Sequence, residues 1–142
     1  ALTFNKPEYK KFSYQYVNGW LIKSFDLLGL TLINGSVKKG SIKENCFGTN
    51  YMSDLVDKNG IKRIGSAQYW KKGSFLQHGE IQINPPFDLW VKIFDQEPPK
   101  PLNLELSNKG IIKHLRKCFL EDYSDSSVEN IFLKPHQIKS IL

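Results

Sequence analysis

Two chain-reversal signals in the middle of the sequence constrain the fold more than any other feature. Two segments rich in strand-forming residues, Ser53–Lys58 and Ile61–Lys71, flank the dipeptide Asn59-Gly60. Asn-Gly is typical of tight hairpins, because both central residues of a type I′ turn need positive φ. A second reversal at Lys72-Gly73 leads into another strand-like segment, Ser74–Asn84. The sequence therefore predicts a three-stranded antiparallel meander.

Apolar and polar residues alternate along the last of these segments. From Gly79 on, the alternation places Ile81 and Ile83 on one face of the strand and Glu80 and Gln82 on the other. A meander also brings residues that are distant in sequence side by side. Cys46, Lys62 and His78 are therefore candidates for one shared pocket, although they span 32 positions.

The other segments alternate between helical and strand-like periodicity, which predicts an α+β fold with an antiparallel or mixed sheet and flanking helices. The expected helices are Pro7 to Leu28 with Gly29 as its C-terminal cap, Phe87–Phe94, Asn108–Tyr123 with Ser107 as its N-cap, and Pro135–Leu142. The expected strands are Leu30–Ile33 and Val128–Leu133, with a loop at Asn34–Glu44. The apolar face expected for the third helix consists of Ile111, Ile112, Leu115, Cys118 and Phe119.

Prolines at positions 98, 99 and 101 favour a linker near the last third of the chain. We expect a main domain over residues 1–96, a Pro-rich linker over 97–103 and a small helix-strand-helix segment over 104–142.

The net charge of +6 comes from 18 lysines and only two arginines, Arg63 and Arg116. Arginine forks read guanine edges, so their scarcity argues against sequence-specific nucleic-acid binding, and we expect no nucleic-acid partner. A basic surface suits an acidic protein partner, whose encounter it would steer. A plain solvated surface is the alternative.

Neither cysteine has a neighbour that suggests a disulfide. Cys46 precedes a Gly-Thr-Asn loop and Cys118 lies in a helical pattern, so two free thiols in a reducing, cytoplasmic setting are expected. No run of about 18 apolar residues occurs, and no leader or membrane partner is expected. The histidines and cysteines show no metal-ligand spacing, so no metal site is expected.

Cys46 and Lys62 are the sharpest candidates for chemistry. A cysteine thiolate can attack an acyl thioester, and a lysine can donate to the oxyanion that develops or neutralise a phosphate. Each has a plain structural alternative, because most cysteines are small buried hydrophobes and most lysines are surface residues.

Small residues at Gly65, Ser66 and Ala67 suggest that a ligand or another backbone comes close to this strand, and a bulge that closes a sheet corner is the alternative. His78 could orient a substrate or simply bond a backbone carbonyl. Asp54 could hold Lys62 by charge, as a cross-strand ion pair, or lie near a nucleotide-bound magnesium.

A combination of motifs across this region suggests a family. Lys62-Arg63-Ile64-Gly65-Ser66-Ala67-Gln68 is followed by Leu76-Gln77-His78-Gly79, and Cys46-Phe47 precedes Asp54-Leu55. Together they resemble the lipoate-protein ligase superfamily, which also contains biotin ligases and octanoyltransferases. Cys46-Phe47 resembles the nucleophile segment of the cysteine-dependent octanoyltransferases. The resemblance implies part of a class II synthetase/biotin-ligase-like catalytic domain, with Gly79 and the residues just named at the substrate site.

The Arg-Arg-x-x-Gly-Gly loop that wraps the acyl chain in this family does not occur in the 142 residues, whereas Ala1-Leu2-Thr3-Phe4 resembles the segment that follows it. The chain therefore looks like the C-terminal part of such an enzyme. A piece carrying the N-terminal half is then a further expected partner.

The resemblance implies attachment of a lipoyl or octanoyl group to a lysine of a lipoyl-domain protein. The favoured mechanism is acyl transfer through a Cys46 thioester, which needs no cofactor. An ATP- and Mg-dependent ligase that forms lipoyl-adenylate is one alternative, and a non-catalytic accessory or truncated binding module is another. The expected partners are acidic: an acyl carrier protein, a lipoyl domain or a glycine-cleavage H protein.

Overall fold

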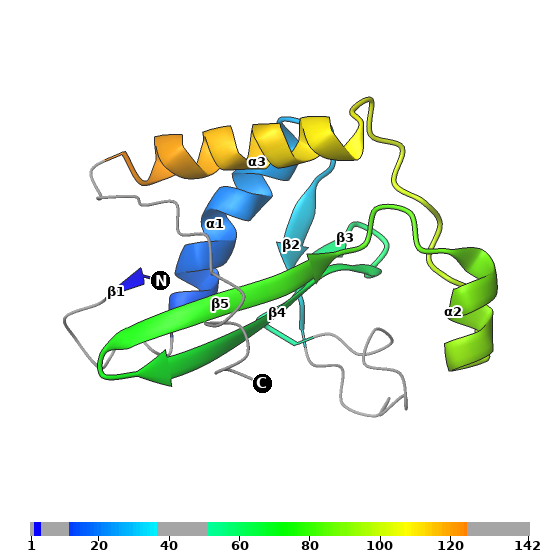
Figure 1. Ribbon diagram of the computed structural model, residues 1–142, viewed down its shortest axis with the longest axis horizontal. Coiled ribbons are helices and arrows are strands. Elements are labelled where there is room, and N and C mark those ends of the chain that lie inside the picture. Colours follow the sequence, from blue (N-terminus) through cyan, green and yellow to red (C-terminus); the bar gives the residue numbers. More distant parts are fainter. Residues whose placement is uncertain (1, 4–11, 37–50, 125–142) are drawn as a thin grey trace, which may run out of the picture.

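The computed structural model describes residues 2–3, 12–36 and 51–124. They form a five-stranded sheet with strand order β1-β5-β4-β3-β2 and three helices (Figure 1). The strands are β1 Leu2–Thr3, β2 Leu32–Asn34, β3 Leu55–Asp57, β4 Lys62–Lys71 and β5 Ser74–Ile81. The helices are α1 Ser13–Asp26, α2 Phe87–Phe94 and α3 Asn108–Asp122. Every strand pairing is antiparallel, so the expected α+β class is confirmed.

The predicted meander is confirmed as β3, β4 and β5. Strands β4 and β5 pair without interruption from Ile64 opposite Ile81 to Lys71 opposite Ser74. The turn between them has positive φ at both central residues, 49° at Lys72 and 77° at Gly73, as a type I′ turn requires.

The Asn59-Gly60 reversal is also present, but the expected type I′ turn is wrong there. Gly60 has φ of 75°, whereas Asn59 is not among the described residues with positive φ. The Gly60 N–H donates to the Asp57 carbonyl at 2.8 Å, and the Asp57 N–H donates to the Ile61 carbonyl at 2.9 Å. A three-residue loop thus closes this hairpin, with glycine only at the position that needs it.

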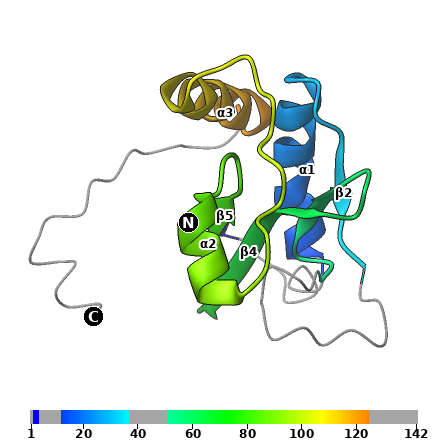
Figure 2. The same cartoon turned by 90° about the vertical axis from the view of Figure 1, so that its right-hand side faces the viewer.

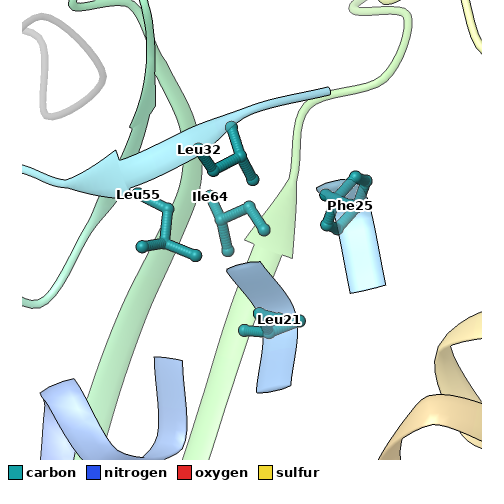
Figure 3. Packing of buried hydrophobic residues seen from close by; sticks show 5 residues of the cluster. All are labelled: Leu21, Phe25, Leu32, Leu55 and Ile64. Atoms are coloured by element: carbon teal, nitrogen blue, oxygen red, sulfur yellow. The ribbon is translucent and has the colours of Figure 1, made fainter. Parts of the chain in front are cut away.

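One face of the sheet is covered by helices. Figure 3 shows the centre of the core, where Leu21 and Phe25 of α1 pack against Leu32, Leu55 and Ile64 of the sheet. Helix α3 packs on α1, and α2 stands apart at the far end of β5 (Figures 1 and 2). Alternation along the strands turns every second side chain to the opposite face of the sheet.

Helix α1 ends as its sequence predicts. Gly29 has φ of 77°, and the Leu30 N–H donates to the Phe25 carbonyl at 2.9 Å. This arrangement satisfies a free carbonyl of the last turn, and only glycine adopts such a φ without strain. The expected start at Pro7 lies outside the described residues, and α1 begins at Ser13.

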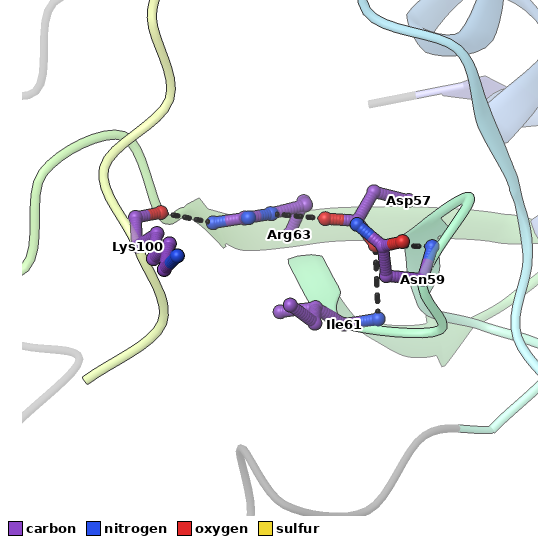
Figure 4. Close-up of polar contacts among 5 residues, drawn as sticks. All are labelled: Asp57, Asn59, Ile61, Arg63 and Lys100. Carbon is purple, nitrogen blue, oxygen red and sulfur yellow. Dashed lines mark hydrogen bonds and ion pairs between the residues drawn. The ribbon is translucent and has the colours of Figure 1, made fainter. Parts of the chain in front are cut away.

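A buried ion pair fixes the start of β4 (Figure 4). The Arg63 Nε donates to the Asp57 Oδ2 at 2.8 Å, and the Arg63 Nη1 donates to the Lys100 carbonyl at 2.8 Å. The other Asp57 oxygen accepts from the Asn59 and Ile61 N–H groups at 2.9 and 3.1 Å. One carboxylate therefore closes the β3–β4 loop and anchors Arg63, which in turn holds the chain that follows α2.

Gln82, which alternation places on the face opposite Ile81 and Ile83, is 3% exposed, because the Leu102 N–H bonds the neighbouring Ile83 carbonyl and brings that segment over the end of β5. Ile112 was expected on the apolar face of α3, but this is wrong: it is 66% exposed, whereas Ile111, Leu115, Cys118 and Phe119 face the rest of the molecule.

Ser107 caps α3 as expected, since its Oγ accepts from the Gly110 N–H at 3.2 Å. The division into residues 1–96, 97–103 and 104–142 stays a prediction. The expected loop at Asn34–Glu44 falls mostly outside the described residues, and so do the strand and helix expected beyond position 127. Among the described residues, no helix has the length and apolar content to cross a membrane.

Candidate functional site

A β-bulge decides on which side of the sheet Lys62 lies. Leu55 pairs with Ile64, but the next residue, Val56, pairs with Lys62, so Arg63 is an extra residue in β4. In a regular strand, Lys62 and Ile64 would share one face. The bulge instead sends Ile64 into the core and Lys62 to the opposite, open face. Bulges are frequent beside active sites for this reason.

The Lys62 ammonium is held by Asp54. Lys62 Nζ lies 3.0 Å from Asp54 Oδ2, and the two side chains are only 11% and 4% exposed. The Asp54 carboxylate also accepts from the Tyr51 N–H at 2.9 Å and the Ser66 N–H at 3.4 Å. The expected pairing of Asp54 with Lys62 is thus what the structure contains. Because those contacts engage both carboxylate oxygens, Asp54 offers a metal ion little.

Gly65 leaves room for the lysine side chain. A Cβ on Gly65 would stand 3.1 Å from Lys62 Cε and 3.9 Å from Asp54 Oδ1. Any larger residue would therefore push the ammonium away from its carboxylate. The glycine lets the lysine lie flat along the sheet.

Gly79 permits a still closer approach between strands. A Cβ there would stand 2.3 Å from the Gly65 carbonyl oxygen and 3.3 Å from Ser66 Oγ. Gly79 pairs with Ser66, so the two expected site segments meet directly across β4 and β5. Gly79 thus lies against another backbone, which is one of the sequence interpretations, whereas Gly65 lies against side chains.

The remaining predicted residues lie farther along the hairpin. His78 pairs with Ala67 and is exposed, on the same face as Lys62 by alternation. Five residues of strand separate Ala67 from Lys62, or roughly 16 Å at the usual rise. His78 is therefore not a direct neighbour of Lys62, and Ser66 points by alternation toward the helix side. Cys46 lies outside the described residues.

The open face also carries apolar residues. Tyr69 and Leu76 form a cross-strand pair and are 65% and 57% exposed, and Ile33 is 56% exposed. Single exposed apolar side chains are normal on a protein surface, so these residues alone assign no ligand or partner to this face. Within the described ranges, no group of His, Cys, Asp or Glu could hold a metal ion.

A cavity of about 520 Å³ lies elsewhere, between the end of β5 and α2. Leu89, Trp90 and Ile93 of α2 form its wall, and none of the predicted site residues lines it. The features that sequence reasoning missed are the bulge at Arg63 and the Arg63–Asp57 pair beside Lys62. Their only sequence signal is an acidic and a basic residue on either side of the Asn-Gly turn, two positions before Asn59 and three positions after Gly60.

Comparison with known proteins adds two kinds of relative. No family model matches the chain. It is 28% identical over 130 residues to the octanoyltransferase LipM of Oceanobacillus iheyensis, covering 81% of this chain and 46% of that protein. It is 26% identical to the LipM of Clostridioides difficile, covering 86% of this chain and 57% of that protein. The chain therefore spans about half the length of the curated relatives it matches.

Solved structures share the fold. One is Ta0514, a T. acidophilum protein assigned as a lipoate protein ligase, with bound lipoic acid. It superposes with a TM-score of 0.72 at 16% identity, over 96% of this chain and 54% of that one. Lipoate-protein ligase A bound with ATP superposes with a TM-score of 0.65 at 15% identity, over 98% of this chain and 54% of that one. At such identities the likeness concerns the fold alone.

Proposed function

Because the chain is a distant member of the lipoate-protein ligase and octanoyltransferase superfamily, we propose that it forms part of a catalytic domain that attaches an octanoyl or lipoyl group to a protein lysine. The acceptor is a lipoyl-domain protein or a glycine-cleavage H protein. The setting is the cytoplasm, where acyl carrier proteins and free thiols coexist.

The observation that carries this proposal is the Lys62 site. A lysine side chain that is 11% exposed, pinned at 3.0 Å by Asp54 and laid over Gly65, is a fixed donor on an otherwise open sheet face. A donor held in advance stabilises charge that develops on a substrate oxygen without having to reorganise. An ordinary surface lysine has no such restraint.

The favoured reaction is a double displacement on Cys46. Its thiolate attacks the carbonyl carbon of an octanoyl thioester, the bond to the carrier sulfur breaks, and the carrier leaves as a thiol after taking a proton. The ε-amine of the acceptor lysine then attacks the Cys46 thioester, loses a proton and releases the Cys46 thiol. Lys62 donates to the carbonyl oxygen in both steps. The donor thioester supplies the free energy, so no nucleotide is required.

The net charge of +6 supports acidic carrier and acceptor proteins as partners, because opposite charges speed encounter at low salt.

An ATP-dependent ligase is the second candidate, and Lys62 suits it too. A fixed ammonium can neutralise the phosphate of an acyl-adenylate as well as it can bond a carbonyl. Magnesium would need other ligands, because Asp54 is already engaged by Lys62 and two N–H groups. A non-catalytic binding module is the third candidate.

The test is transfer to an apo lipoyl domain, followed by intact mass. Octanoyl carrier protein is the donor in one reaction, and lipoate with ATP and Mg²⁺ is supplied in the other. We expect an octanoyl adduct on the acceptor without ATP. A product only with lipoate and ATP would establish the ligase reaction. If neither donor gives a product, the non-catalytic binding module is the remaining candidate.

A further inference from the structure

Asn18 is a fully buried polar residue that no part of the reaction explains. It lies on α1, is 0% exposed, and faces the edge of the sheet. Its Nδ2 donates to Asn34 Oδ1 of β2 at 3.1 Å and to the Ser53 carbonyl at 3.3 Å. Its own Oδ1 is buried and has no hydrogen-bond partner among the described residues. An unsatisfied buried carbonyl opposes folding, so packing alone would favour an apolar side chain here.

The backbone that Asn18 holds leads directly to Asp54. Ser53 is the residue before Asp54, and the Gly35 N–H donates to the Asp54 carbonyl at 2.8 Å. The Asp54 N–H donates to the Tyr51 carbonyl at 2.9 Å, while the Tyr51 N–H donates back to Asp54 Oδ2 at 2.9 Å. The Ser53 and Asp54 carbonyls are therefore tied to α1 and to the end of β2, and the segment forms a closed turn.

This turn carries the carboxylate that fixes Lys62. Asp54 Oδ2 lies 3.0 Å from Lys62 Nζ. The aspartate side chain is short and cannot compensate for a shift of its backbone. A displacement of the Ser53–Asp54 backbone would thus be passed on to the ammonium. Helix α1 is the rigid element of the core, because Leu21 and Phe25 anchor it to the sheet. Helix α1 can therefore hold the Asp54 turn in one position, as a site with a defined geometry requires.

We propose that Asn18 is a positioning residue for Lys62, acting through the Ser53 carbonyl and Asp54. This inference rests on the proposed function for its catalytic meaning, although the mechanical link can be measured without any activity. Asn18 keeps a buried orphan oxygen because its amide N–H groups place the Asp54 turn, a trade of stability for function.

The direct test compares wild type with Asn18→Leu, whose side chain has a similar shape and no polar atoms. Lysine reactivity is measured by brief acetylation with isotope-labelled acetic anhydride and peptide mass spectrometry. We expect the variant to remain folded, while the acetylation rate of Lys62 rises several-fold. Lys117, in an exposed ion pair with Glu121 on α3, is the internal control and should not change.

The same variant separates positioning from binding. We expect kcat for octanoyl transfer to fall by about ten- to a hundredfold, as a small misplacement near reacting atoms does, with KM for the carrier unchanged. A folded Asn18→Leu protein with wild-type Lys62 acetylation would overturn the inference.

Asn34 provides a second pair of variants if Asn18→Leu does not fold, because its Oδ1 fixes the orientation of the Asn18 amide that bonds the Ser53 carbonyl. Asn34→Asp keeps the oxygen that accepts from Asn18, whereas Asn34→Leu removes it. Raised Lys62 acetylation in Asn34→Leu, with wild-type acetylation in Asn34→Asp, supports the inference, and equal rates in both overturn it. If Lys62 becomes reactive while kcat stays at wild type, Asn18 positions Lys62 but the proposed role of Lys62 in transfer is wrong.

Discussion

Lys62 and Asp54 depend on each other, because neither side chain is more than about a tenth exposed and each would otherwise leave a charge in a water-poor place. The Asp54 carboxylate also accepts hydrogen bonds from two backbone N–H groups, so its position does not depend on Lys62 alone. The result is an ammonium with one defined position. That restraint, rather than the charge itself, distinguishes Lys62 from the other lysines of the chain.

Lys62→Met and the double variant Lys62→Met/Asp54→Asn separate stability from chemistry. The single variant leaves an unpaired buried carboxylate and should lower the free energy of unfolding by about 3–5 kcal/mol. The double variant removes the charge and should recover most of that loss. Urea unfolding measures the stability, and octanoyl transfer should fall by about a hundredfold or more in both variants. Recovery of transfer in the double variant would show that the lysine charge is not needed.

Gly79→Ala and Gly19→Ala form a matched pair. At Gly79 the new methyl group would stand 2.3 Å from the Gly65 carbonyl oxygen, so the strands must shift, at a cost of about 1–3 kcal/mol. At Gly19, inside α1, it would meet nothing within 4 Å and should stabilise the helix by about 0.5–1 kcal/mol. Opposite shifts of the urea midpoint are expected. Equal shifts would refute the close approach of β4 and β5.

Two ion pairs, Lys62–Asp54 and Arg63–Asp57, fix the start of strand β4. The bulge turns Lys62 to the open face, while Arg63 joins Asp57 and the Lys100 carbonyl and is 5% exposed. Asp57 in turn accepts two N–H groups of the β3–β4 loop. The bulge, the loop and the chain after α2 are therefore fixed together.

Asp57→Asn tests this organisation against an exposed pair. It leaves the Arg63 charge buried without its carboxylate, and we expect a loss of about 3–5 kcal/mol in the free energy of unfolding. Lys117→Ala breaks the exposed pair with Glu121 on α3 and should change it by less than about 0.5 kcal/mol. Chemical denaturation of both proteins is the measurement. A similar small loss for Asp57→Asn would mean that the bulge holds without its ion pair.

Helices α1 and α3 meet through an aromatic cluster that responds to pH. The Tyr123 ring lies against Tyr16 and Phe119, with centroid separations of 6.1 and 4.7 Å. Burial first, then the nearby Tyr16 and Asp122, raises the pKa of Tyr123 from 10.0 to about 12. Between these two values the unfolded chain loses the phenol proton while the folded chain keeps it. The contribution of Tyr123 to the free energy of unfolding is therefore complete below pH 10 and is lost as the pH rises toward 12.

Tyr123→Phe should remove the part of the alkaline loss of stability that comes from Tyr123. The hydroxyl is buried without a hydrogen-bond partner among the described residues, so the variant should be at least as stable as wild type at pH 8. Urea midpoints at pH 8 and pH 11 should then differ less in the variant than in wild type. Tyr69→Phe, at an exposed tyrosine, is the control and should keep the wild-type difference. An unchanged difference in Tyr123→Phe would contradict the raised pKa.

Local signals predicted much of the molecule. Glycines and alternation placed both hairpins, Ser107 and Gly29 marked helix ends, and the Asp54–Lys62 pair was anticipated as a cross-strand contact. These features depend on residues close in sequence or on turn chemistry, and local and tertiary preferences agree there.

The features that escaped prediction depend on pairing between distant segments. The bulge at Arg63 appears only when β3 and β4 are in register, and the burial of Gln82 requires the chain around Leu102 to return to the sheet. Asn18 offered no signal, because its partners Asn34 and Ser53 are brought to it by the fold. Polar residues of this kind break the local pattern, and such breaks concentrate at functional sites.

Intact mass of the protein after incubation with octanoyl carrier protein, without ATP, tests the proposed acyl transfer most directly. We predict an octanoyl adduct that hydroxylamine removes, that Cys46→Ala abolishes, and that forms about a hundredfold more slowly in Lys62→Met. Cys46→Ser should also fail, because a hydroxyl without a strong base is a poor nucleophile. Acceptor modification that demands ATP and persists in Cys46→Ala would contradict the account and establish the ligase reaction instead.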